Sequence, residues 1–328
     1  MRTQPPVRPE PRTRTLAAPP SLVPLLARGA LLSPFKRPRP DSPVPATRLV
    51  LSGVRVDLAH LAAYERVCGF ATGADALPVT YPHVLAFPLA MRIMAGRAFP
   101  LPLLGLVHTS IEITQHQESA ATAEYELGVL VEKLVPHRRG TEAIVLTEAR
   151  AHGRLVWESR STYLARHRPR DPGQDRTPRN ASREAPPETP CRAARRTAPR
   201  AASRAAVHNA PPAPSPEGPK PLPAVAEWSL ARDVGRRYGA VSGDRNPIHL
   251  HPLTARLFGF PRAIAHGMWT VARCLAEYGP QQAVGVRAEF RAPVLLPRTV
   301  TYAARGPSFE LRSGGRVHLT GDVRPLHA

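Results

Sequence analysis

The sequence predicts an α+β fold in which one plan, a long apolar helix followed by antiparallel strands, occurs twice. Three observations lead to this prediction. Two proline-poor blocks, at residues 46–165 and 224–328, flank a stretch rich in proline, alanine and arginine. Short sequence matches occur in the same order in both blocks. In each block a long apolar run precedes segments in which apolar and polar residues alternate, as in half-buried strands.

Proline and charge mark the boundaries of the blocks. Of the 40 prolines, 12 lie within residues 1–45 and 14 within residues 166–223. We expect residues 1–45 to form a partly disordered arm that packs on the first block, and residues 166–223 to form a disordered linker. Each remaining block is long enough to bury one core. A wholly disordered chain and a single globule of 328 residues are both excluded.

In the first block we expect a helix over about residues 82–96. The strands should cover residues 104–114, 121–134 and 144–164, with a turn at His152-Gly153. In the second block we expect a helix over about residues 262–278 and strands over 284–291, 299–304 and 309–323, with a turn at Gly314-Gly315.

The matches between the blocks indicate an internal duplication. Tyr81–Pro88 aligns with Phe260–Gly267 at an offset of 179 residues, and Gly153–Leu155 aligns with Gly315–Val317 at an offset of 162. A central helix wrapped by an antiparallel sheet, present twice and packed as an internal pseudo-dimer, is a double hot-dog arrangement.

The formal net charge of +20 does not by itself indicate a nucleic-acid partner. Only Lys36, Lys133 and Lys220 of the 45 basic residues are lysine, a bias that suits a GC-rich genome. No basic run is interleaved with aromatic residues, and no zinc-finger or RNA-recognition motif occurs. We expect no nucleic-acid partner, although a positive surface also suits an anionic thioester carrier.

Cysteine usage and hydropathy exclude further classes. The three cysteines are too far apart to predict a disulfide framework or a metal site. No run of about 18 apolar residues is present, so we expect no membrane span. Prolines and Arg28 interrupt the apolar stretch Leu16–Leu32, which argues against a signal peptide. We therefore expect a cytoplasmic protein.

The segment Tyr238–Pro252 carries the candidate chemistry. Ser242-Gly243-Asp244 is a turn sequence, and Asn246-Pro247 turns the chain again. Pro252 and Gly259 suit the two ends of a short helix at Leu253–Phe258. The bent loop therefore brings Asp244 and His249 close together, and a carboxylate that converges with an imidazole is what proton transfer requires.

Ser242-Gly-Asp-Arg-Asn-Pro-Ile-His249, followed by Ala265-His266-Gly267-Met268, resembles the MaoC-like family of (R)-specific enoyl-thioester hydratases and 3-hydroxyacyl-thioester dehydratases. Tyr81–Met91 and Trp228–Arg273 resemble double hot-dog members of that family from actinobacteria. The resemblance covers roughly residues 46–165 and 226–325, and excludes the linker and the first forty residues.

The resemblance implies a role for each matching residue. Asp244 and His249 form the catalytic pair and hold one water between them, with the division of the two protons left open. Asn246 orients the pair or the water. The Gly267 backbone amide binds the thioester oxygen at a helix start, where the helix dipole favours an oxyanion. Ser242 belongs to the same loop as a positioning hydroxyl rather than a nucleophile, since no Gly-x-Ser-x-Gly elbow surrounds it.

The implied substrate is a 3-hydroxyacyl or trans-2-enoyl thioester of coenzyme A or of acyl carrier protein, in fatty-acid metabolism. No cofactor and no metal is expected, and a homodimer is left open. Three other functions compete: a hot-dog thioesterase, a non-catalytic acyl-thioester-binding subunit, and a nucleic-acid binder. A thioesterase would need an acidic residue on the central helix, and Glu277 lies too near the end of that helix.

The first block departs from the family pattern. It has no Gly-Asp-x-Asn-Pro-x-His segment, and the offset of 179 places Phe87-Pro88 where the second block has His266-Gly267. Because proline has no amide hydrogen, we expect this copy to be non-catalytic, leaving one active site per chain. Leu85, Phe87 and Met91 are candidates for an acyl tunnel or for ordinary core positions. His83, His108, His116, His251 and His266 are interpreted as structural, with His266 a candidate for orienting the loop.

Overall fold

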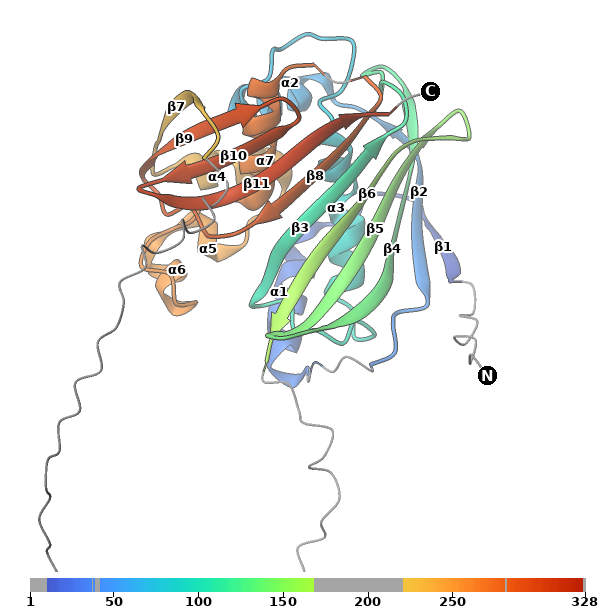
Figure 1. The fold of residues 1–328 in the computed structure, drawn as a ribbon. Coiled ribbons are helices and arrows are strands. Elements are labelled where there is room, and N and C mark those ends of the chain that lie inside the picture. The colour runs from blue at the N-terminus through green and yellow to red at the C-terminus, as the bar shows by residue number, and fades with distance from the viewer. Residues whose placement is uncertain (1–10, 37, 39–41, 168–220, 281, 327–328) are drawn as a thin grey trace, which may run out of the picture. The chain divides into compact units, whose positions relative to one another are not determined.

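One sheet of eleven strands organises the part of the chain that the structure describes. The structure is a computed structural model, and it describes residues 11–36, 38, 42–167, 221–280 and 282–326. Figure 1 shows the long helices α3 and α7 on the same side of this sheet. Their buried side chains join the inward side chains of the strands in one core cluster that includes residues of both blocks. The α+β prediction is confirmed.

The two blocks share one order of elements: strand, helix, central helix, then four strands. The first copy contains β2 (Thr47–Arg55), α2 (Leu58–Cys68), α3 (Tyr81–Met94), β3 (Leu106–Gln115), β4 (Glu124–His137), β5 (Gly140–Ala151) and β6 (Arg154–Arg166). The second contains β7 (Ala224–Leu230), α4 (Val234–Ser242), α5 (Pro247–Leu250), α6 (Pro252–Leu257), α7 (Gly267–Tyr278), β8 (Val284–Phe290), β9 (Arg298–Arg305), β10 (Ser308–Ser313) and β11 (Arg316–Pro325). The predicted duplication and double hot-dog fold are confirmed.

The sheet order makes the relation between the copies visible. The strands run β1-β2-β4-β5-β6-β3-β8-β11-β10-β9-β7, so the order in the second copy mirrors that in the first. The copies meet where β3 pairs antiparallel with β8, from Gln115–Val284 to Ser110–Glu289. Ile111 and Ala288 face each other in this ladder, and both are fully buried. The ladder therefore joins two cores into one.

The predicted start of the second central helix requires correction. Helix α7 begins at Gly267 rather than near residue 262, whereas α3 begins at Tyr81, next to its predicted start at residue 82. Pro88 therefore lies inside α3 and is not the counterpart of Gly267, contrary to the alignment at an offset of 179. The connection before the central helix spans residues 69–80 in the first copy and 243–266 in the second. This difference in length shifts the correct offset.

The N-terminal arm contributes an exposed strand, a helix and a short 3-10 turn. β1 (Arg12–Leu16) pairs in parallel with β2, and α1 (Leu22–Leu32) is followed by a short 3-10 turn, η1 (Ser33–Phe35). Gly29 lies directly against Leu103 and Ala95, which lets α1 approach the end of α3. Lys36 donates hydrogen bonds to the backbone oxygens of Met94 and Gly96, and so ties the arm to the same place. The arm lies against the first copy.

Most of the predicted linker, residues 166–223, lies outside the described residues. Among the residues that are described, no helix has the length and apolar character needed to cross a membrane. Cys68 and Cys274 are buried and are not joined in a disulfide.

Replacing Ile111 by alanine should destabilise both copies together. The change removes a fully buried side chain at the β3–β8 ladder and leaves a cavity, so unfolding free energy should fall by about 2–5 kcal/mol. Urea denaturation should show one transition shifted as a whole, since the core is continuous. The matched control is Glu112→Ala on the same strand, where an exposed pair with Arg287 predicts a change within about 0.5 kcal/mol. Two separate transitions, with only one shifted, would contradict the joined core.

Candidate active site

A cavity of about 1030 Å³ lies between the two copies. Asp244, His249 and Gly267 of the second copy line it, together with residues of α3, β3 and the N-terminal helix α1 from the first half of the chain. Asn246 and His266 also line this cavity, and Ser242 does not. All the residues that the motif predicted, except Ser242, therefore line this one cavity.

The loop that carries Asp244 is shaped by its own backbone contacts. Helix α4 ends at Ser242, and Gly243 follows in the left-handed conformation (φ 75°), which glycine adopts without strain. The Ser242 hydroxyl accepts a hydrogen bond from the Asp244 amide at 3.2 Å. One Asp244 carboxylate oxygen accepts from the Asn246 amide at 3.1 Å. The carboxylate is thereby held at the turn, with 31% of the side chain exposed toward the cavity.

Asn246 and His251 hold the two short helices that follow. The Asn246 side chain accepts from the Ile248 amide and caps α5, the helix that contains His249. His251 caps α6 in the same way through the Leu253 amide. Asn246 thus positions His249 through the backbone, and His251 has the structural role that was expected of it.

His249 is a buried imidazole with a defined tautomer. Its Nδ1 lies 2.9 Å from the backbone oxygen of Ile264, and because a carbonyl can only accept, Nδ1 carries the hydrogen. Burial lowers the pKa of His249 below its ordinary value of 6.5, against the opposing effects of Asp244 and of this hydrogen bond. In the neutral ring Nε2 keeps its lone pair. His249 is therefore prepared to accept a proton.

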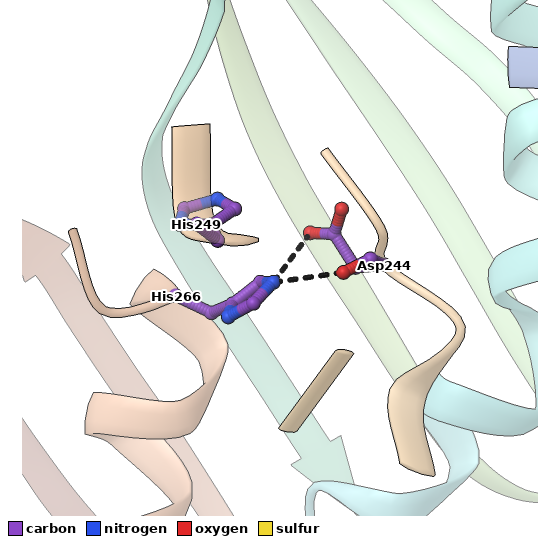
Figure 2. A group of neighbouring side chains, drawn as sticks. All are labelled: Asp244, His249 and His266. Carbon is purple, nitrogen blue, oxygen red and sulfur yellow. Dashed lines mark hydrogen bonds and ion pairs between the residues drawn. The ribbon is translucent and has the colours of Figure 1, made fainter. Parts of the chain in front are cut away.

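His266 holds the Asp244 turn in place through a hydrogen bond to its backbone. Its Nε2 lies 2.9 Å from the Asp244 backbone oxygen and 3.9 Å from the carboxylate, as the dashed lines in Figure 2 mark. Burial and the adjacent His249 lower the pKa of His266 to about 3, so the ring is neutral and the longer contact is not an ion pair. The ring also stacks on His249 with centroids 3.7 Å apart. His266 orients both members of the pair.

Gly267 offers the amide expected at a helix start. It is the first residue of α7, and no hydrogen bond to its amide occurs within the described part of the chain. A Cβ at this position would meet the Phe290 ring at 2.8 Å, so glycine allows that ring to pack against the helix start. In the first copy the corresponding amide, that of Tyr81, donates to the Pro78 oxygen, and Pro82 follows it. The first amide of α3 is therefore already hydrogen-bonded within the protein.

The spacing of α4 and α5 depends on Gly235. A Cβ on Gly235 would overlap the backbone oxygen of His249, so only glycine lets α4 pack this closely on the loop that carries His249. Gly235 is in a helical conformation and needs no special φ angle. Glycine is needed at this position for steric reasons alone. The close packing that it allows fixes the position of the His249 backbone relative to α4.

Asp244, His249 and His266 each place one ligand atom within 4.8 Å of the others, which raises the question of a metal. His249 Nδ1 and His266 Nε2 already bond to backbone oxygens. The two rings are stacked with an interplanar angle of 26°. Lone pairs in the planes of nearly parallel rings do not converge on a point about 2.1 Å from both nitrogens. The donor set does not fit a metal centre, and it suits proton transfer.

Two further histidines line the cavity, contrary to the expectation that they are ordinary. His83 of α3 and His108 of β3 both face it from the first copy. His116, by contrast, lies outside the lining and is 3.5 Å from Glu158. No sequence motif links His83 or His108 to the Asp244 loop, and only the packing of the two copies brings them to it.

Comparison with known proteins gives consistent matches. A family model described as MaoC like domain matches residues 215–306. The chain is 33% identical over 297 residues to 3-hydroxyacyl-thioester dehydratase X of Mycobacterium tuberculosis. The alignment covers 88% of this chain and 92% of that protein. The crystal structure of HtdX from the same organism matches with a TM-score of 0.65 at 31% identity, over 85% of this chain and 100% of that one. A MaoC-like dehydratase from Phytophthora capsici shares the fold at 14% identity and a TM-score of 0.58, over 87% and 96% of the two chains.

Gly235→Ala should destabilise the protein although alanine is the better helix former. The added methyl group must push the His249 backbone away, and such overpacking costs about 1–3 kcal/mol, more than the roughly 1 kcal/mol gained in helix propensity. Urea denaturation measures the difference. Gly285→Ala is the control, because the nearest atoms there are 3.8 Å from the added carbon. Equal or greater stability of Gly235→Ala would show that α4 and the His249 loop are not in close contact.

His249 should remain neutral below pH 6.5 in the folded protein. Burial disfavours the imidazolium, so its pKa is lowered and protonation should begin only at pH values below the ordinary midpoint. A ¹⁵N NMR titration of histidine rings should follow this change and also show the hydrogen on Nδ1. The urea-unfolded chain provides the reference, with a midpoint near 6.5. A folded-state midpoint at or above that of the unfolded chain would contradict the assignment.

Proposed function

This chain belongs to the MaoC-like dehydratase family, and on that premise we propose that it catalyses the reversible dehydration of (R)-3-hydroxyacyl thioesters to trans-2-enoyl thioesters. The observation that carries the proposal is the tautomer of His249. A neutral imidazole with a free Nε2 stands beside the Asp244 carboxylate and lines the same cavity as the Gly267 amide. These are the base, the negative charge and the oxyanion donor that removal of a proton next to a thioester requires.

The proposed dehydration moves one proton between two atoms of the substrate. His249 Nε2 accepts the proton from C2 while the thioester oxygen accepts a hydrogen bond from the Gly267 amide. The negative charge that develops on this oxygen lies at the start of α7, where the helix dipole stabilises it. The imidazolium then donates the same proton to the C3 oxygen, the C3–O bond breaks, and water leaves. Asp244 stabilises the transient imidazolium, and hydration follows the reverse path.

The cavity suits an acyl chain attached to an anionic carrier. His83, Phe87, Met91 and Met94 recur on one face of α3 and line it, and Leu26, Ala27 and Ala30 of α1 do the same. Exposed arginines also line it, at positions 138, 139, 166, 245 and 291. We propose that the apolar face receives an acyl chain longer than four carbons and that the arginines meet the phosphates of coenzyme A or of a carrier-protein arm.

The same proposal includes one active site per chain, a reaction without a cofactor, a cytoplasmic location and assembly as a homodimer. The first two residues of α3 support a single site, because the Tyr81 amide is already bonded and Pro82 has no amide hydrogen. Sedimentation of the full chain tests the homodimer.

Asp244→Asn and His249→Gln should each lower the rate of hydration at least about 100-fold, the usual scale of acid–base catalysis, without unfolding the protein. The assay follows enoyl absorbance and free thiol together, with crotonyl-CoA and with a ten-carbon enoyl-CoA, and the longer substrate should react with the higher kcat/KM. His251→Asn is the control, since His251 lies outside the cavity lining and asparagine also caps helices.

The same assay separates the competing functions. Release of free thiol would indicate a thioesterase, because hydration of the double bond leaves the thioester intact. Glu277, the acidic residue considered for that reaction, instead pairs with Arg273 near the end of α7. Binding without either signal would indicate a non-catalytic subunit. Near-normal hydration in either variant would refute the assignment of the catalytic pair.

A further inference from the structure

The wall of the cavity that belongs to the first copy contains two histidines, His83, which is buried, and His108, which is half-buried. His83 lies one helical turn before Phe87, and the Phe87 ring lies 3.8 Å from the place where a Cβ on Gly243 would be. His108 lies on β3, two residues before the last inter-copy pair, Ser110–Glu289. Both histidines are therefore next to the point where the cavity opens between the copies.

A β-bulge aims His108 into the cavity. The pairing of β3 with β6 shifts between His108 and Ser110, so that Ile111 faces Ser161 while His108 faces Tyr163. Ser161 and Tyr163 share one face of β6, and His108 therefore shares the face of Ile111. Without the extra residue, alternation would have turned Thr109 inward instead. The Thr109 hydroxyl donates to the Thr162 backbone oxygen at 3.2 Å and stabilises the bulge.

The His108 ring is held between aromatic neighbours. It stacks on Tyr163 with centroids 4.6 Å apart and contacts Phe290 at 4.9 Å. The His83 ring lies parallel to it, with an interplanar angle of 12° and a centroid distance of 6.2 Å. Phe290 in turn packs against Gly267. A continuous set of contacts thus runs from His83 through His108 and Phe290 to the oxyanion position.

His108 lines the cavity and keeps an unpartnered lone pair on Nε2. A hydrogen bond with the Ser110 backbone raises its pKa, as expected when the ring donates to a carbonyl, yet burial lowers the pKa of His108 to about 3 overall. The ring is therefore neutral. Nε2 has no hydrogen-bond partner among the described residues, and neither has Nδ1 of His83. A buried acceptor of this kind costs free energy unless a bound molecule donates to it.

This inference rests on the proposed function. The thioester oxygen lies at Gly267 and C3 lies beside Asp244 and His249, so the segment from C1 to C3 passes the wall that holds His108. In that segment a 3-hydroxyacyl thioester has one hydrogen-bond donor, the 3-hydroxyl group. We propose that His108 is a substrate-binding residue whose Nε2 accepts a hydrogen bond from the substrate 3-hydroxyl. His83 fixes the orientation of the His108 ring.

The proposed contact also fits the movement of protons. When His249 returns the C2 proton to the C3 oxygen, it needs a lone pair on that oxygen, so the hydroxyl hydrogen must point elsewhere. His108 Nε2 receives this hydrogen and keeps it as the C3–O bond breaks. In hydration His108 holds one hydrogen of the water while His249 removes the other. The catalytic pair comes from the second copy and this acceptor comes from the first.

The test compares both directions of the reaction in the full chain, with 3-hydroxydecanoyl-CoA and trans-2-decenoyl-CoA. His108→Phe keeps a ring between Tyr163 and Phe290 and removes the acceptor. It should raise KM for the hydroxyacyl substrate about tenfold and leave KM for the enoyl substrate, which has no hydroxyl group, within twofold. The equilibrium constant fixes the ratio of the two kcat/KM values, so kcat of hydration should fall by the same factor.

His108→Gln should restore KM for the hydroxyacyl substrate to within about threefold, because its amide oxygen can accept in place of Nε2. His116→Gln, a histidine outside the cavity lining, is the control. If His108→Phe fails to fold, as judged by circular dichroism, His108→Leu takes its place with the same expectation.

An equal rise of KM for both substrates would overturn the proposal, since it would indicate contact with the thiol arm. Equal behaviour of His108→Phe and His108→Gln would also overturn it, because ring packing alone would then explain the effect. A wild-type chain that lacks dehydratase activity would refute the proposed function and this inference with it. An active wild type whose KM values are unchanged in His108→Phe would refute this inference alone.

Discussion

The antiparallel ladder between β3 and β8 is the contact on which the site depends. It holds the two copies in register up to Ser110–Glu289 and stops there, while β3 continues beside β6 to Leu106. The cavity opens where the ladder ends. His108 lies just before that point on one strand and Phe290 just after it on the other, and Phe290 meets the start of α7 at Gly267. The register of this ladder therefore places side chains from both copies around the same cavity.

The copies differ chiefly in the connection that precedes the central helix. Residues 69–80 make a short connection that ends with the Tyr81 amide bonded to Pro78. Residues 243–266 make a longer one, which adds α5 and α6 and leaves the Gly267 amide available. Lengthening a connection costs little entropy, so the architecture tolerates this change. The longer segment carries Asp244 and His249, the proposed acid–base pair, and the first half of the chain supplies the opposite wall of the cavity.

Local sequence was sufficient to predict the central helices with the strands that follow them, the Gly314-Gly315 turn and the Asp244 loop, because each depends on nearby residues. The start of α7 was predicted about five residues too early, since the offset between copies changes with the length of the preceding connection. His83 and His108 were missed for a different reason. The bulge at Thr109 reverses the alternation that identifies inward positions, and no local signal marks it. Burial beside Asp244 arises only when the copies pack.

The joining of both copies in one polypeptide has an evolutionary consequence. In a symmetric dimer every substitution occurs in both subunits, so a residue that improves one wall of the tunnel also appears beside the acid–base pair. Here the sequences of α3 and of β3 can change without altering α7 or β8. His108 and Glu289 stand close to the same ladder end, yet they are encoded separately. The two walls of the cavity can therefore change independently in this protein.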